Sequence, residues 1–363
     1  MPVAQILIAP DSFKGSATSA QVAKALADGW KIMRPDDEIV IAPFADGGEG
    51  TLDCIESVTP GSVRIPIMVQ GATGIEHQSS WLLVGSDTAV IEMATLCGIT
   101  TVDELDPLGA HSFGLGQAIK AVLADARVNE VLIAVGGSAS TDAGMGALTA
   151  LGFKALDADG NELARGGGDL HRLARIENPA DLRKLNRGIK VLVDVQSPLT
   201  GPNGAAYIFG PQKGADAAQV EHLDKGLLHI LNVLGVADRA GYGAAGGVSC
   251  GLAVVLGASI VSGVSTIAEL IGLEEKIKGS DCVITGEGSF DDQSYRGKAV
   301  GYLLESAKEI ERPVMIACGV NKNAESSSIL SLIELASSVQ SAIDDSQHWL
   351  IECGKVLASR FNH

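Results

Sequence analysis

The feature that most limits the fold of this chain is a repeated order of apolar run, glycine-containing turn and helix. Residues 5–10 form a short apolar run, and residues 19–33 place apolar side chains at helical spacing. A second apolar run at 38–44 leads into Ala-Asp-Gly-Gly-Glu-Gly-Thr, where another helical stretch begins. This alternation of strand and helix favours a parallel sheet covered by helices.

The middle of the chain follows a different pattern. Between 63 and 93, short apolar runs such as Arg-Ile-Pro-Ile-Met-Val are separated by turns, which predicts antiparallel strands. The order of strand and helix resumes near 281. We therefore predict an α/β fold with two α/β domains. Residues 1–62 and 280–363 would form a Rossmann- or flavodoxin-like domain with a parallel sheet, and residues 63–279 an inserted domain with a mixed sheet.

Length and charge exclude several classes of protein. A chain of 363 residues corresponds to about two domains. The net charge of −17 disfavours nucleic-acid binding, which needs a basic surface. The six cysteines form no Cys-x-x-Cys pair, as is usual in a reducing cytosol. Neither a signal peptide nor an apolar segment of about 18 residues is evident. We expect a cytoplasmic protein without nucleic-acid or membrane partners.

Glycine-rich turns are the first candidates for ligand binding, because six of them follow predicted strands or begin predicted helices. Glycine lets the backbone approach an anion, and the N–H groups at a helix start point toward a bound phosphate. The competing interpretation is an ordinary tight turn between strand and helix. The residues in or beside such turns that we expect to bind substrate or phosphate are Ser12, Gly47, Gly48, Gly136, Gly137, Ser138, Gly246 and Gly247.

Carboxylates stand at or just past the ends of predicted strands. Ligands of open α/β sheets bind at these ends, where a carboxylate can hold Mg²⁺ or accept a proton. The competing interpretation is a cap or turn residue, which is at least as well supported for Asp11 and Asp142. The six carboxylates are Asp11, Asp46, Asp142, Asp194, Glu287 and Asp291.

Basic residues in similar places are few. Lys14, Lys213, Arg296 and Lys298 each adjoin a Gly or Ser cluster. Each could hold a phosphate or carboxylate group, because the chain as a whole is acidic and an anion needs local cations. The competing interpretation for each is a solvated surface side chain.

Longer motifs run through most of the chain. They are IAPDSFKGS at 8–16, ADGGEGT at 45–51, IEMA at 91–94, VGGSASTDAGMGAL at 135–148, PLTGPNGAAYIFGPQKGAD at 198–216, GAAGGVSCGL at 243–252, TGEGSFDDQS at 285–294 and RGK at 296–298. Together and in this order they resemble the glycerate kinases of the bacterial type-1 family, over about residues 5 to 320.

The resemblance implies ATP and a divalent cation, D-glycerate as acceptor and, in most bacterial members, 2-phosphoglycerate as product. It also implies an active site in a cleft between two α/β domains. Transfer to the other hydroxyl, giving 3-phosphoglycerate, stays open, as does a homodimer. A kinase for another small hydroxy acid and a non-catalytic anion-binding protein of two domains are the competing functions.

The chain departs from the family pattern at a few positions. Ser197 replaces the usual Asn of a Cys-Asp-Val-x-Asn-Pro-Leu motif, while Asp194 of that motif is kept. Val300 replaces a usual Pro, Tyr302 replaces a Gly, and Ala143 stands where Gly is frequent. These changes leave the acceptor preference less defined than the class of reaction.

The resemblance to the glycerate kinases implies a role for each group of candidate residues. The turns at Gly136-Gly137 and Gly246-Gly247 would hold nucleotide phosphates, because phosphoryl transfer mainly needs positioning and neutralised charge. Lys14 or Lys213 would hold the glycerate carboxylate or the γ-phosphate. The candidates for orienting the attacking hydroxyl and taking its proton are Asp46 and Asp194, and those for binding Mg²⁺ are Asp194, Asp291 and Glu287.

Overall fold

The computed structural model describes residues 3–292, 294–295, 299–324 and 326–361. The chain divides into two compact units. Unit 1 contains the residues up to Asp46, Asp53–Pro60 and the residues from Val264 onward. Unit 2 contains Gly47–Leu52 and Gly61–Gly263.

Unit 1 is built on a parallel sheet of five strands. In sequence they are β1 (Gln5–Ile8), β2 (Glu38–Ile41), β11 (Cys282–Phe290), β12 (Val314–Asn321) and β13 (Ile329–Ser331). Their order in the sheet is β13-β12-β11-β1-β2, and each neighbouring pair is parallel. This is the flavodoxin-like order, with the first strand beside the third. The predicted parallel sheet of this type is confirmed.

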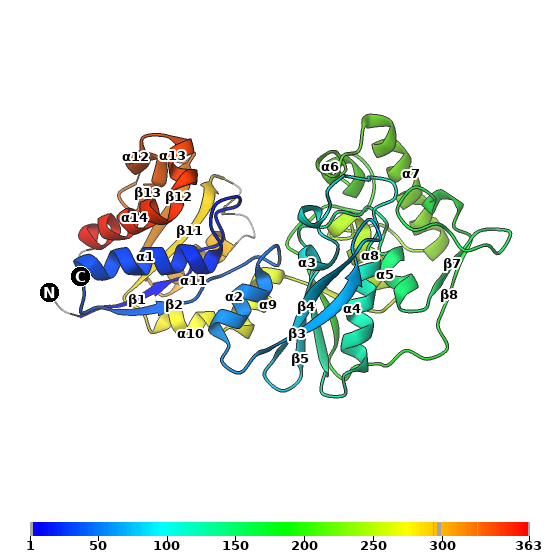
Figure 1. The fold of residues 1–363 in the computed structure, drawn as a ribbon, viewed down its shortest axis with the longest axis horizontal. Coiled ribbons are helices and arrows are strands. Elements are labelled where there is room, and N and C mark those ends of the chain that lie inside the picture. The colour runs from blue at the N-terminus through cyan, green and yellow to red at the C-terminus, as the bar shows by residue number, and fades with distance from the viewer. Residues whose placement is uncertain (1–2, 293, 296–298, 325, 362–363) are drawn as a thin grey trace. The chain divides into compact units, whose positions relative to one another are not determined.

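Helices cover the sheet of unit 1. The first, α1, is capped by Thr18, whose hydroxyl accepts a bond from the backbone N–H of Gln21. Gly29 lets α1 approach α14 closely, because a Cβ there would lie 2.1 Å from the Ile351 carbonyl oxygen. The two helices lie side by side (Figure 1). The helices that lie wholly or partly in unit 1 are α1 (Ser19–Met33), α2 (Thr51–Val58), α9 (Gly263–Leu270), α10 (Leu273–Lys278), α11 (Ala299–Glu309), α12 (Leu332–Ala336), α13 (Val339–Asp344) and α14 (Ser346–Arg360).

Unit 2 is built on a mixed sheet of six strands, in the order β10-β9-β6-β5-β4-β3. The strands are β3 (Val63–Gln70), β4 (Glu76–Val84), β5 (Thr88–Glu92), β6 (Glu130–Ala134), β9 (Gly188–Leu192) and β10 (Ser259–Val261). The antiparallel pairs are β3–β4 and β4–β5, while β5, β6, β9 and β10 are mutually parallel. The predicted mixed sheet is confirmed. A separate antiparallel pair joins β7 (Lys154–Leu156) and β8 (Arg175–Glu177).

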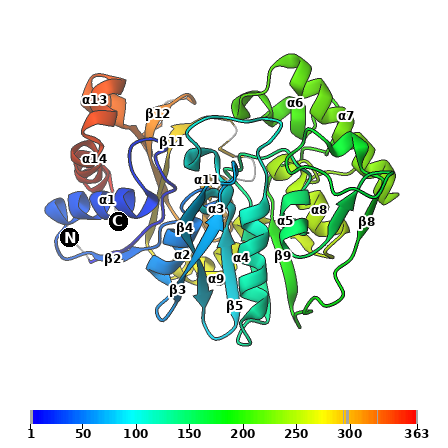
Figure 2. The same cartoon turned by 45° about the vertical axis from the view of Figure 1, so that its right-hand side comes forward.

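Helices lie around this sheet, and α3 and α4 pack against strands β3 to β5 (Figure 2). The core between them is almost wholly aliphatic, with Trp81, Phe153 and Tyr242 as its buried aromatic residues. The α-helices are α3 (Met93–Cys97), α4 (Phe113–Ala124), α5 (Met145–Ala150), α6 (Ala205–Phe209), α7 (Ala217–Leu234) and α8 (Val248–Val254). The 3₁₀ helices are η1 (Ile99–Thr101), η2 (Leu170–Arg172), η3 (Pro211–Lys213) and η4 (Ala244–Gly247).

The extents of the two units differ from the sequence prediction at residues 47–52, 61–62 and 264–279. Residues 264–279 were assigned to the middle domain, but they belong to unit 1, where α10 packs beside α11. Residues 47–52 were assigned to the first domain and belong to unit 2. A helical pattern shows which face is apolar but not which sheet that face covers. Among the described helices, none combines the length and the apolar character needed to cross a membrane.

Candidate active site

The connection that follows β1 leads to β2 on one side of the unit 1 sheet, and the connection that follows β11 leads to β12 on the other side. Strands β1 and β11 are neighbours, and their carboxyl ends are joined by a bond from the Asp11 N–H to the Gly286 carbonyl oxygen, 2.8 Å long. The loop after β1 passes close to β11, since a Cβ on Gly288 would lie 3.6 Å from the backbone nitrogen of Lys14. Such a switch point is where open α/β sheets bind ligands.

Three carboxylates interact at this switch point. Burial raises the pKa of Asp11 from its ordinary value of 3.8 to about 7, and the negative charges of Asp46 and Glu287 act in the same direction. The Ser12 N–H, 2.6 Å from Asp11 Oδ1, and the Lys14 ammonium oppose this rise in pKa. A carboxyl group that titrates near neutral pH at a strand end is a marker of a functional site.

Asp11 is therefore the residue that the sequence analysis undervalued. Its position gave equal support to a turn or cap role, whereas the structure places it against Asp46 and Glu287. Two of these three, Asp46 and Glu287, were predicted site residues, and the structure brings them together through Asp11. The signal available in the sequence was the position of Asp11 three residues past β1, a strand that lies between β11 and β2 in the sheet.

Asp291 lies after β11 at the same edge of the sheet. Its carboxylate is 3.9 Å from the Lys322 ammonium, and its backbone N–H donates to Ser294 Oγ at 2.9 Å. Ser289 Oγ, one residue before the end of β11, is buried and has no hydrogen-bond partner among the described residues. The predicted site residues Arg296 and Lys298 lie outside the described residues.

The carboxyl ends of the parallel strands in unit 2 form a second group. Asp194 was predicted to stand at or just past the end of a strand, and it does: β9 ends at Leu192 and Asp194 is half-buried beyond it. Its carboxylate accepts bonds from Ser262 Oγ at 2.8 Å and from the Gly263 N–H at 3.1 Å. Asp194 thus binds the start of α9, a favourable place for an anion.

Glu92 is a residue of this edge that the sequence analysis did not assign. It ends β5, is buried, and accepts bonds from the backbone N–H groups of Gly50 at 3.0 Å and Leu52 at 2.9 Å. These bonds hold the loop that contains Gly47 and Gly48. The available signal was its place within IEMA, at the end of an apolar run.

The glycine turns have different surroundings. Gly136 packs on the loop of Gly47 and Gly48: its N–H donates to the Gly47 carbonyl oxygen at 3.1 Å, and a Cβ on it would lie 2.6 Å from Gly48 Cα. Gly137 is exposed at the same edge. By contrast, Gly246 and Gly247 are buried, and a Cβ on Gly246 would lie 2.1 Å from the Ser140 carbonyl oxygen. This turn has a packing role, and phosphate binding by it stays a prediction.

Lys213 is not a solvated lysine, since it is 2% exposed. Its ammonium donates to Ser138 Oγ at 2.9 Å and to the Ser140 carbonyl oxygen at 2.5 Å. Burial lowers the pKa of Lys213 to about 8, although the nearby Asp142 carboxylate favours the charged form. Lys213 therefore supports the turn that carries Ser138, and a direct contact with substrate stays a prediction.

Asp142 has the structural role that was weighed for it. Its buried carboxylate accepts bonds from the N–H and hydroxyl of Ser112, at 2.8 and 2.7 Å, and from the N–H groups of Gly144 and Gly146. A carboxylate with this many internal donors stabilises its turn. We assign it no part in the chemistry.

The described residues contain no group of three or more His, Cys, Asp or Glu side chains arranged to hold a metal ion. Of the predicted ligands, Glu287 and Asp291 belong to unit 1 and Asp194 to unit 2, and metal binding by them stays a prediction. The pair of Asp11 and Asp46, whose charges repel each other, fits Mg²⁺ better. In phosphoryl-transfer sites this ion needs only one or two protein carboxylates beside phosphate and water oxygens.

Comparison with known proteins adds independent information. The model of the glycerate kinase family matches residues 6–362. The chain belongs to the glycerate kinase family. A glycerate 2-kinase of Escherichia coli K12 is 41% identical over 325 residues, which are 87% of this chain and 85% of the relative. A glycerate kinase of Bacillus subtilis 168 is 38% identical over the same shares of the two chains.

A solved structure from Salmonella typhimurium LT2, assigned as glycerate kinase 2, has the same fold with a TM-score of 0.81. It is 33% identical, and the match covers 99% of this chain and 98% of the other. Membership of the glycerate kinase family confirms the resemblance that the motifs indicated. The protein is accordingly a kinase of this family, with small molecules as substrates.

Proposed function

We propose that the protein transfers the γ-phosphate of ATP to a hydroxyl of D-glycerate, with 2-phosphoglycerate as product. The observation that carries the proposal is the group of Asp11, Asp46 and Glu287 at the switch point of the unit 1 sheet. An anion-binding protein would gain nothing from three carboxylates beside its ligand. A kinase uses them for the metal and for the proton.

The chemistry assigned to these residues follows from the bonds that change. The glycerate hydroxyl oxygen forms a bond to the γ-phosphorus, the bond from the γ-phosphorus to the bridging oxygen of ADP breaks, and the hydroxyl proton goes to a carboxylate. Asp11 or Asp46 accepts this proton. A carboxyl group whose pKa is about 7 is suited to that task near neutral pH.

Mg²⁺, when bound, would neutralise charge on the phosphate oxygens. Within the group at the switch point, whichever of Asp11 and Asp46 does not take the proton would hold the metal, with Glu287 beside it. Lys14 is exposed in the loop after β1 and would hold an oxygen of the transferred phosphate. The unpartnered Ser289 hydroxyl can donate a further bond to a phosphate oxygen.

In unit 2 we assign glycerate binding to the edge formed by Gly137, Ser138 and Asp194. The exposed Gly137 N–H can donate to the glycerate carboxylate. Asp194 can accept a bond from a glycerate hydroxyl while it stays bound to Ser262. Loops anchored to Glu92 and Lys213 hold this edge in place.

The test is an assay of ADP release with a panel of three- and four-carbon hydroxy acids, followed by phosphorus NMR of the product. Turnover with D-glycerate and a phosphomonoester on the second carbon supports the proposal. A phosphoester on the third carbon would correct the product. Turnover only with another acid would assign a different acceptor, and no ADP release with any acid would contradict the function.

A further inference from the structure

A pocket of about 1070 Å³ lies within unit 1, between α11 and strands β12 and β13. None of the residues assigned above lines it. It exists because residues 322–328, in the part that the structure describes, form no helix between β12 and β13. The face of these two strands beside α11 is therefore left open, where a strand–helix–strand connection would ordinarily cover it.

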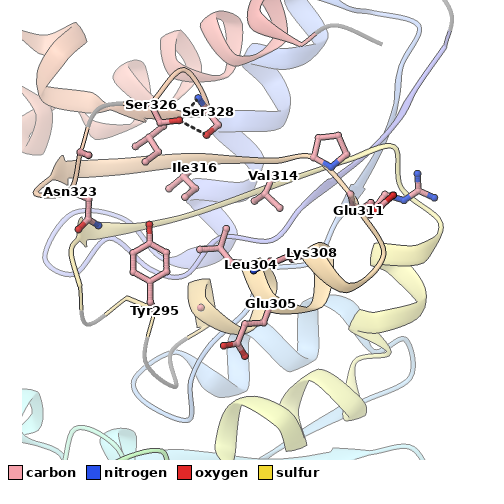
Figure 3. Close-up of a pocket in the computed structure, with 15 residues that line it drawn as sticks. Tyr295, Leu304, Glu305, Lys308, Glu311, Val314, Ile316, Asn323, Ser326 and Ser328 are labelled. Atoms are coloured by element: carbon pink, nitrogen blue, oxygen red, sulfur yellow. Dashed lines mark hydrogen bonds between the residues drawn. The ribbon is translucent and has the colours of Figure 1, made fainter.

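The interior of the pocket is apolar. Leu304 of α11 faces Val314 and Ile316 of β12, and Ile329 of β13 completes the floor. Figure 3 shows the side chains of Leu304, Val314 and Ile316 gathered between the helix and the sheet. At one end stands Tyr295, whose ring is 48% exposed and contacts Phe290 at 5.3 Å between centroids. An apolar space with an aromatic ring at its end suits a flat ligand ring.

One polar group in the lining points to a ligand with hydrogen-bonding edges. The side-chain nitrogen of Asn323 is buried and has no hydrogen-bond partner among the described residues, and the same holds for Nε of Arg312, which also lines the pocket. A buried donor without a partner is costly, so a group of this kind calls for an explanation. A carboxamide offers one donor and one acceptor side by side, which matches the ring nitrogen and amino group on the edge of adenine.

The charges around the pocket offer a polyanion no net attraction. Lys308 and Arg312 line it together with Glu305 and Glu311, so the lining has no net charge. Ser326 and Ser328 add hydroxyl groups, which share a bond of 2.9 Å. A neutral nucleoside with ribose hydroxyls fits this lining better than a polyanion does.

The position of the pocket connects it with the carboxylate group at the switch point. Tyr295 and Asn323 follow the carboxyl ends of β11 and β12, and they lie at the same end of the pocket (Figure 3). The loops at these ends are joined by a bond from the Lys322 N–H to the Phe290 carbonyl oxygen, 2.9 Å long. A nucleotide whose base enters here would extend its phosphates along the sheet edge that carries Asp291 and Asp11.

We propose that this pocket binds the adenine and ribose of the nucleotide substrate. Asn323 contacts the edge of the base, Leu304 and Val314 hold its faces, and Tyr295 packs at the entrance. The identity of the nucleotide rests on the proposed function, but its binding can be measured without glycerate.

The test uses the full-length protein and calorimetric titration with ADP and, separately, with pyrophosphate, both with Mg²⁺. Asn323→Ala removes the amide, and Leu304→Trp fills the pocket with an indole ring. The matched controls are Gln340→Ala, which removes an exposed amide on α13, and Leu335→Trp, which enlarges a half-buried leucine of α12 outside the pocket. Melting temperatures check that each variant is folded.

We expect the Kd for ADP to rise about tenfold in Asn323→Ala, which is the effect of losing one hydrogen bond. In Leu304→Trp, where the indole ring fills the pocket, the Kd should rise further. Pyrophosphate binding and both controls should be unchanged. Unchanged ADP affinity in folded Asn323→Ala and Leu304→Trp would overturn the proposal, as would an equal loss of ADP and pyrophosphate. If Leu304→Trp does not fold, Asn323→Ala decides.

Failure of the proposed function has a different result. In one case the wild type binds ADP, the two pocket variants do not, and no hydroxy acid is phosphorylated. That result would support the nucleotide site and contradict the proposed kinase function. In the other case the wild type phosphorylates D-glycerate and the pocket variants bind ADP normally. That result would support the proposed function and contradict nucleotide binding in the pocket. A wild-type protein that does not bind ADP would overturn the pocket outright.

Discussion

Replacing Asp11 by Asn removes a carboxylate that the folded protein holds close to two others. Burial and the charge of Asp46 raise the pKa of Asp11 from 3.8 to about 7. A shift of this size corresponds to at most about 4 kcal/mol of linkage between protonation and folding. Because Asp11 is partly exposed and shares the site with Lys14, we expect about half of this, roughly 2 kcal/mol.

The direction of the pH dependence follows from the raised pKa. Below about pH 4 the carboxyl is protonated in both the folded and the unfolded chain, so it contributes no difference. Between about pH 4 and pH 7 the unfolded chain loses the proton while the folded chain keeps it, so the wild type loses stability as pH rises. Above pH 7 the loss is complete. The gain in stability of Asp11→Asn should therefore grow up to pH 7 and then stay constant.

The assay is urea denaturation without Mg²⁺ at pH 5, 6, 7 and 8, with Asp36→Asn, an exposed carboxylate in a turn of unit 1, as matched control. Kinase activity is measured on the same samples with Mg²⁺ added, and kcat should fall by about 10²-fold or more in Asp11→Asn only. A gain in stability that is the same at pH 5 and pH 8 would refute the raised pKa. Wild-type turnover by a folded variant would refute the role in chemistry.

Four further outcomes are expected. Lys14→Ala should raise the KM for glycerate or lower kcat by about tenfold, the scale of one charge-assisted contact; unchanged kinetics would make Lys14 a surface residue. Asp194→Asn should lower kcat by about 10²-fold with little change in Tm, because an amide oxygen still accepts the bonds from Ser262 and Gly263; a variant that unfolds but keeps its activity per folded molecule would contradict this. The folded-state pKa of Lys213 is about 8 against 10.5 when unfolded, so wild-type stability should rise between pH 8 and pH 10.5 as the folded state sheds its proton first, and Lys213→Met should lack this rise in denaturation curves. Excess EDTA should abolish turnover and added Mg²⁺ restore it; full activity in EDTA would exclude a metal requirement.

The class of both sheets was predictable because it depends on short-range patterns. Apolar runs of four to nine residues and glycine turns are visible in the order of residues, and they match β1, β2, β11 and β12. The change to antiparallel strands after residue 63 was visible in the same way.

The tertiary structure decided which side chains meet. Asp11, Asp46 and Glu287 are up to 276 positions apart, and they interact because β1 stands between β2 and β11. Lys213 is buried because η3 brings it to the turn of Ser138, whereas its neighbours in sequence are glycine and polar residues.

Asp194 lies two residues past the end of β9, and only the folded structure shows that it accepts a hydrogen bond from Gly263, at the start of α9. The open face of β12 and β13, with its pocket, depends on the connection between these strands, whose described residues form no helix. Local periodicity reports which face of an element is apolar, but strand order and the packing of loops depend on pairing between distant segments. That pairing is why the sequence could determine the architecture of the protein and only the folded structure could determine its site.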